Sequence, residues 1–376
     1  MKNSFQFVTT EGYGNHNYRG MDTNISLKNQ NDEIIKVRFD ISPKALSQRS
    51  YDAECDMQRK LLDGTRIVIF THSHNDHFGA DILEYATEDQ KDKIRIVWKD
   101  DGNFSPERPK GQEKKYMERK RILDEFSNTI LISDETKYFS FKDSGLSFEI
   151  RVVDHSCYKG YNLGKVSMVF LENNNKKQNL KIGFSSDVSG PEYDEAKDII
   201  CEENPDILFL DGPYNDIFSV FGDAEQQKKA FKALESSYDD LRAVLSKTDS
   251  YVVLMHHFLR NCEVNSVTEV KDYLKRRVEG VEKRSKKKEI SQEIIDSMKD
   301  TYKKISNIMD EISKYEYKII LPTNIESGIV NIDIMRNNKE IEKNGNFRPK
   351  SFKSALSYDA FFSQSSQPRR KWFKRG

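Results

Sequence analysis

The stretch of sequence that decides the fold is RIVIFTHSHNDHFGA, residues 66–80. It opens with the apolar, β-branched run RIVIF, which is typical of a buried strand. The polar segment behind it contains three of the chain's seven histidines and one aspartate: His72, His74, Asp76 and His77. Metal-binding side chains gathered directly after a buried strand indicate a metal site at the end of that strand.

The spacing within this cluster suits two ions. His72 and His74 are two residues apart in an extended segment, so their side chains project to the same side and can bind one ion. Asp76 and His77 follow where the chain begins a helix, and they can reach a second ion about 3.5–4 Å away. Imidazole nitrogens with a carboxylate favour Zn²⁺, with Mn²⁺ or Fe as alternatives.

Further candidate ligands follow other apolar runs of the chain. His155 follows RVVD, Asp187 follows KIGFSS, and the doublet His256–His257 follows YVVLM. Because strand ends meet at one edge of a layered fold of sheets and helices, we expect these side chains to join the cluster. Asp187 could bridge the two ions, since Ser189 is at least as good an N-cap for the next helix. The doublet leaves open which of its histidines binds. His16 lies outside this pattern and is expected at the surface or at a pocket rim.

Composition excludes several classes of function. The chain has 61 Lys plus Arg and 61 Asp plus Glu, so its formal net charge is zero, which excludes a globally basic nucleic-acid coat. It has no run of about 20 apolar residues and no apolar signal core, so we expect neither a membrane span nor export. The four cysteines are scattered without CxxC spacing, which favours a reducing, cytoplasmic location.

The order of ligands resembles a known family. His-x-His-x-Asp-His, then a histidine, an aspartate and a terminal histidine, is the order of the metallo-β-lactamase superfamily. More closely, the chain resembles an uncharacterised, mainly archaeal group of metal-dependent hydrolases within it. The stretches that carry the resemblance are THSHNDHFGA, NFSPERPKGQEKKYMERKR, SSDVSGPEYDEAKDIICEENPDILFLDGP and VVLMHHFLRN.

The resemblance implies the fold and the division of ligands. The fold class is α/β, an αββα metallo-β-lactamase-type sandwich of two mixed sheets with outer helices, plus a C-terminal helical arm. One ion would be held by His72, His74 and His155. The other would be held by Asp76, His77 and one of the doublet, His256 or His257, with Asp187 bridging the two ions. We therefore expect a hydrolase core over 1–264 with an insertion over 101–126, a helical arm over 265–318, a returning strand over 319–342 and a basic, partly disordered tail over 343–376.

The resemblance also implies a hydrolytic function. Two ions would lower the pKa of a bridging water so that a metal-bridging hydroxide is available, with Asp76 accepting a proton or orienting it. A carboxylate at Asp187, where the common zinc β-lactamases have Cys, favours phosphodiester or nucleotide-type substrates ahead of esters, lactones or thioesters. An iron-dependent oxidoreductase and a non-catalytic interaction module are the alternatives from other classes. A missing flavin domain argues against the first, and the complete ligand set argues against the second.

Supporting roles are predicted for several other residues. Asp211 and, less strongly, Asp154 are expected to orient a metal-bound histidine by a hydrogen bond, or to be ordinary turn residues. Four cations of the insertion are expected either to bind an anionic substrate, including a nucleotide or nucleic acid, or to form a solvated helix face: Lys114, Lys115, Arg119 and Arg121.

The arm and the tail are the candidate surfaces for partners. The arm has an apolar stripe at helical spacing, formed by Ile294, Ile295, Met298, Tyr302, Ile305, Ile308, Met309 and Ile312. Either the sandwich covers this stripe, or it contacts a second copy or a protein partner. The tail sequence RRKWFKR suits contacts with phosphate and bases, a partner or an anionic membrane surface, or is a disordered terminus.

Overall fold

The central strand β4 (Thr65–Phe70) explains the arrangement of layers in the computed structural model of the chain. Ile67 and Ile69 face the core between the two sheets, whereas Val68 and Phe70 face a second apolar cluster outside the first sheet. A strand that is covered on both faces must be apolar at every position, which is why RIVIF shows no alternation. The structure describes residues 6–9, 23–28, 33–41, 62–74, 76–100, 112–141, 144–156, 163–173, 180–190, 192–215, 224–258, 264, 266–285, 290–321 and 328–331.

The first sheet has seven strands in the order β14-β1-β2-β3-β4-β5-β6. Its pairs are antiparallel from β14 to β3 and parallel from β3 to β6. The strands β2 and β3 form an antiparallel pair with Thr23 opposite Phe39. The bounds of the strands other than β4 are Gln6–Thr9 (β1), Thr23–Lys28 (β2), Ile34–Phe39 (β3), Arg95–Lys99 (β5), Asn128–Ile132 (β6) and Gly328–Asn331 (β14).

The second sheet also has seven strands, in the order β13-β12-β11-β10-β9-β8-β7. It is antiparallel from β7 to β10 and parallel from β10 to β13. The two sheets pack face to face, and the rings of Phe39 and Phe184 stack between them with centroids 4.6 Å apart. The bounds are Lys137–Phe141 (β7), Leu146–Asp154 (β8), Lys165–Asn173 (β9), Leu180–Phe184 (β10), Ile207–Asp211 (β11), Tyr251–Met255 (β12) and Ile319–Ile320 (β13).

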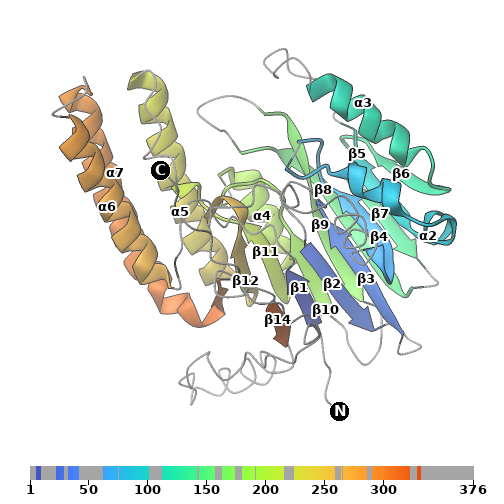
Figure 1. Cartoon of the computed structure of the whole chain (residues 1–376). Helices are drawn as coiled ribbons and strands as arrows, with labels where there is room; N and C mark the ends of the chain where they lie inside the picture. Colours follow the sequence, from blue (N-terminus) through green and yellow to red (C-terminus); the bar gives the residue numbers. More distant parts are fainter. Residues whose placement is uncertain are drawn as a thin grey trace, which may run out of the picture.

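Helices cover both outer faces of this sandwich (Figure 1). Tyr116 of α3 joins Phe78 and Trp98 in the apolar cluster outside the first sheet, while α4, α5, α6 and α7 lie on the side of the second sheet. The bounds are Ala80–Tyr85 (η2), Glu88–Lys93 (α2), Gln112–Leu123 (α3), Asp194–Glu203 (α4), Ala224–Lys247 (α5), His256–Phe258 (η4), Val267–Ser285 (α6), Gln292–Ile312 (α7) and Ser313–Lys318 (η5). The predicted αββα sandwich of two mixed sheets is therefore confirmed.

Some predictions fall on residues that the structure does not describe. These are residues 101–111 of the insertion, His16 and the basic tail over 343–376. Among the helices that are described, none combines the length and the apolar character needed to cross a membrane.

The apolar stripe of the arm is covered within the same chain. Ile305, Met298 and Met309 on α7 are buried in the main core, where α7 packs on both α5 and α6. Ion pairs flank this contact, for example between Arg242 of α5 and Glu311 of α7. Of the two interpretations of the stripe, coverage by the sandwich's own helices is the one that the structure supports.

Two isoleucines on α7 test this packing. Ile305 is fully buried, so Ile305→Ala should lower the free energy of unfolding by about 2–5 kcal/mol. Ile308 is only partly buried on the same helix, so Ile308→Ala should cost about 1 kcal/mol. Chemical denaturation measures both values. Equal losses for the two variants would contradict the observed orientation of α7.

Candidate metal centre

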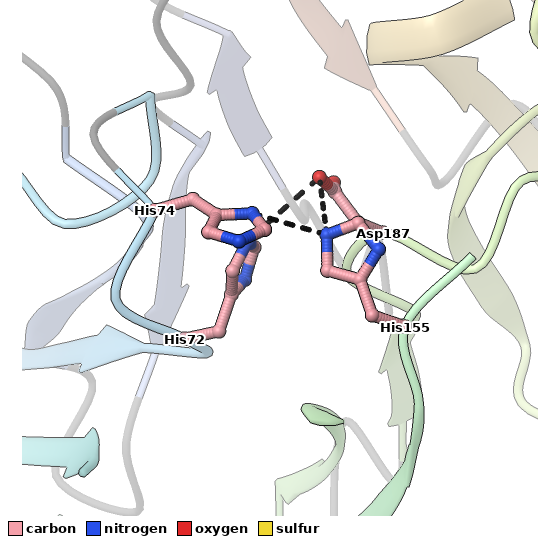
Figure 2. A group of neighbouring side chains, drawn as sticks. All are labelled: His72, His74, His155 and Asp187. Carbon is pink, nitrogen blue, oxygen red and sulfur yellow. Dashed lines mark hydrogen bonds and ion pairs between the residues drawn. The ribbon is translucent and has the colours of Figure 1, made fainter. Parts of the chain in front are cut away.

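The predicted ligands converge at one edge of the sandwich because they follow strands that end there. His72 and His74 follow β4 of the first sheet, whereas His155 follows β8 and Asp187 follows β10 of the second. Figure 2 shows these four side chains pointing towards one another from the two sheets. One ligand atom from each lies within 4.8 Å of all the others.

The separations within this group fit a single metal ion. His74 Nδ1 lies 3.1 Å from His155 Nε2, which is 3.5 Å from Asp187 Oδ2. His72 Nε2 lies 3.8 Å from the same oxygen. A tetrahedral zinc ion with bonds of about 2.0–2.1 Å places its ligand atoms about 3.3–3.4 Å apart, so the observed distances bracket the expected value.

His72 gives a second indication that a cation fits this site. Its Nε2 atom is buried and has no hydrogen-bond partner among the described residues. Burial lowers the pKa of His72 well below its ordinary value, and the nearby His77 and His74 add to this shift. The ring is therefore neutral near pH 7, with a lone pair directed into the group, as a metal ligand requires.

The other oxygen of Asp187 faces a different set of residues. Oδ1 lies 3.0 Å from Nε2 of His77, and Asp187 also has a ligand atom within 4.8 Å of Asp211 and His257. Burial opposes the charge on His77, but the carboxylates of Asp187 and Asp40 outweigh it and raise the pKa of His77 well above its ordinary value. The two oxygens of Asp187 therefore face different side chains, Oδ2 towards His72 and His155 and Oδ1 towards His77.

Each buried histidine has its Nδ1 atom held by another group. His155 Nδ1 donates to the backbone oxygen of Ser156 at 2.9 Å, and His257 Nδ1 donates to Asp211 Oδ2 at 2.8 Å. His72 Nδ1 lies 3.2 Å from the hydroxyl of Thr71. These bonds leave the Nε2 atoms to face an ion, as is usual for histidines that bind metals.

Asp40 is the site residue that the sequence analysis missed. It is fully buried at the end of β3, where it accepts hydrogen bonds from Thr71 N (2.8 Å), Thr71 Oγ1 (2.7 Å) and His77 Nδ1 (2.9 Å). Because the Thr71 hydroxyl donates to Asp40, it must accept from His72 Nδ1. Burial raises the pKa of Asp40, and His77 and Thr71 partly offset this. The available signal was its position directly after a strand, as for the other ligands.

The chain is similar to several archaeal proteins. It is 25% identical to the UPF0282 protein of Methanocaldococcus jannaschii over 216 residues, which are 55% of this chain and 67% of that protein. The corresponding protein of Methanopyrus kandleri is 24% identical over 61% of this chain and 74% of its own. No protein-family model matches the chain. The predicted resemblance to a group of archaeal proteins is confirmed, whereas membership of the metallo-β-lactamase superfamily stays a prediction.

Two solved structures are similar at low identity. A long-form RNase Z from yeast matches with a TM-score of 0.39 and 12% identity, over 68% of this chain and 38% of the RNase Z chain. Unliganded yeast PDE1 matches with a TM-score of 0.38 and 11% identity, over 73% of this chain and 95% of its own.

The remaining predicted site residues differ in how deeply they are buried and in their hydrogen-bond partners. Asp211 is fully buried and bonded to His257, which is the placement that an orienting role requires. Asp154 is exposed at the end of β8, and the neighbouring His155 takes its partner from Ser156 instead. Asp76 is half-buried, and the side chain of His256 is outside the described residues.

The four cations predicted to bind substrate do not form one group. Arg119 is buried, with its Nη2 atom 2.9 Å from Asp81 Oδ2, so its contact in this structure anchors α3 on η2. Lys114 and Arg121 are exposed on α3, and the side chain of Lys115 is not described. A role in substrate binding stays a prediction for these residues.

The first prediction for the site concerns metal content. The purified wild-type protein should bind two ions per chain, because Asp187 presents one oxygen to each group of histidines. The double variant His72→Ala/His74→Ala should lose at least one ion, as measured by elemental analysis after dialysis. Two ions retained in that variant would show that the ligands are wrongly assigned.

The second prediction concerns Asp40. Asp40→Asn keeps the shape of the side chain but places an amide against several donors, so His77 loses its fixed orientation. Metal affinity should fall about 10- to 100-fold at the ion beside His77, measured by competition with a chelator. Asp154→Asn makes the same change of charge at an exposed site and should leave affinity unaltered. Equal effects from the two variants would remove Asp40 from the metal site.

Proposed function

We propose that the protein is a binuclear-metal-dependent hydrolase that acts on phosphodiester or nucleotide-type substrates. The ions would be divalent, Zn²⁺ first, with Mn²⁺ or Fe as alternatives. The observation that carries this proposal is the position of Asp187, whose Oδ2 atom faces His72 and His155 while its Oδ1 atom faces His77. A bridging carboxylate of this kind holds two ions close enough to act on one substrate.

The residues divide between the two ions. His72, His74, His155 and one oxygen of Asp187 would hold the first ion. His77, His257, Asp76 and the other oxygen of Asp187 would hold the second. When bound, such a pair of ions activates water and stabilises the negative charge that develops during displacement at phosphorus or carbon.

The chain's own groups would prepare the site for this chemistry. Asp40 accepts a hydrogen bond from Nδ1 of His77, and Asp211 accepts one from Nδ1 of His257. These bonds would leave the Nε2 atoms of both rings available to the ions. Asp76 lies between His74 and His77, is half-buried, and would accept the proton that leaves the attacking water. No other residue is required to move a proton in this scheme.

The ligands proposed for the first ion would favour an anionic substrate beside that ion. His72, His74 and His155 are neutral ligands, so only a share of Asp187 offsets the charge of the ion beside them. A phosphodiester would gain from this positive field, whereas a neutral ester or lactone would not.

Hydrolysis of bis-p-nitrophenyl phosphate by the metal-loaded protein tests the proposal. Asp76→Asn should lower kcat by about 10²- to 10⁴-fold, because the amide cannot accept the proton. Asp154→Asn, also near the end of a ligand-bearing strand, should retain wild-type turnover. If the protein cleaves uncharged lactones or esters faster than this phosphodiester, the proposed substrate class is wrong and the ester class takes its place. Bound iron with visible absorbance and no hydrolysis would favour an oxidoreductase.

A further inference from the structure

The loop that carries His257 is held by more than Asp211. The backbone oxygen of Phe258, the next residue, accepts a hydrogen bond from Asn215 Nδ2 at 3.0 Å. Asn215 Oδ1 in turn accepts from the hydroxyl of Tyr238 on α5. Tyr238 and Asn215 are both fully buried. Because a tyrosine hydroxyl donates at one end and a carbonyl accepts at the other, these two bonds fix the orientation of the Asn215 amide.

The same two loops are also packed against each other. A Cβ atom on Gly212 would lie 2.6 Å from Cβ of Phe258, so only glycine allows this approach. The ring of Tyr214 meets the ring of His257 edge to face, with centroids 5.0 Å apart. The segment after β11 therefore packs against the short helix η4, and the side chain of Asn215 donates a hydrogen bond to the backbone of that helix.

Ser237, which precedes Tyr238 on α5, packs against the loop that carries Asp187. Gly190 has a φ of 114°, and a Cβ atom there would lie 2.8 Å from the backbone oxygen of Ser237. Asp211 joins this loop to the other, since its backbone oxygen accepts from Gly190 N and its Oδ2 atom accepts from Ser189 N. One turn of α5, at Ser237–Tyr238, thus contacts the loop of Asp187 directly and the loop of His257 through Asn215.

We propose that Tyr238 and Asn215 are positioning residues for the second ion, acting through Phe258 on the ring of His257. This inference rests on the proposed binuclear site. Asp211 fixes the His257 ring relative to its own backbone, because it bonds both N (3.0 Å) and Nδ1 (2.8 Å) of that residue. It cannot hold the next peptide in place. Metal ligands need placement within about 0.5 Å, and the Tyr238–Asn215 pair supplies the second fixed point.

Two substitutions test separately the Tyr238–Asn215 and Asn215–Phe258 hydrogen bonds. Tyr238→Phe removes the hydroxyl and keeps the ring that fills the core. Asn215→Asp keeps an acceptor for Tyr238 but removes the donor to Phe258. Ser250→Ala is the matched control, because its buried hydroxyl donates to Pro205 O at the opposite end of β12.

The measurement is titration of the metal-free full-length proteins with Co²⁺. The visible absorption of bound cobalt reports the geometry of each site, and chelator competition gives the affinity of each ion. In wild-type protein and in Ser250→Ala, two ions should bind. In Tyr238→Phe and Asn215→Asp, affinity for the second ion should fall about tenfold with an altered spectrum, while the first ion binds within about twofold of wild type.

The outcomes distinguish the two proposals. Failure of the wild type to bind two ions would overturn the binuclear site itself. Two ions bound with wild-type affinity in both variants would overturn only the positioning role. Equal loss at both ions, in step with a lower melting temperature, would also overturn it, since general loosening of the fold would then explain the effect. If one variant fails to fold, the other decides by the same criteria.

Discussion

The carboxylate of Asp187 is the group on which the whole site depends, because it stands where the two sheets present their histidines. An anion buried at this point is stable only when positive charge lies close to both of its oxygens. The sheets must therefore end at matching levels. A backbone hydrogen bond between the sheets helps to achieve this, from Ser167 N of β9 to Thr71 O after β4 at 3.0 Å, and within the second sheet Ser156 N donates to Asp187 O at 2.9 Å. The core between the sheets thus sets the distance between ligands that come from different sheets.

Unusual backbone conformations gather around the same site. In the described part of the chain, four residues other than glycine have positive φ, and three of them flank the ligands: Asp40, Ser186 and Ser189. The fourth, Asn204, ends α4 in the left-handed conformation that commonly ends a helix. Such conformations cost about 1–3 kcal/mol each and persist only where the surroundings impose them. Here the surrounding hydrogen bonds of Thr71 and Asp211 impose them, and the side chains are turned towards the site as a result.

The sequence predicted those parts of the structure that depend on local pattern. RIVIF and its histidines identified the central strand and the edge where the site lies, and the spacing of apolar residues located α7. Contacts between distant residues were not accessible in this way. Asp40 was missed as a site residue, because nothing local shows that β3 pairs in parallel with β4 and so ends beside His77. Arg119 looked like a free cation, because its partner Asp81 is 38 residues away. Nothing local distinguishes the two histidines at 256–257, and the hydrogen bond from His257 to Asp211 of a neighbouring strand is seen only in the structure.

The pairing of β1 with β14 has a consequence for how the chain is made. Residues 6–9 are synthesised well before their outer partner, residues 328–331, which form the last of the described strands. Until it is synthesised, β1 exposes an unpaired edge, and such edges invite pairing with other chains. Completion of the first sheet therefore waits for residues 328–331, which cover this edge of β1.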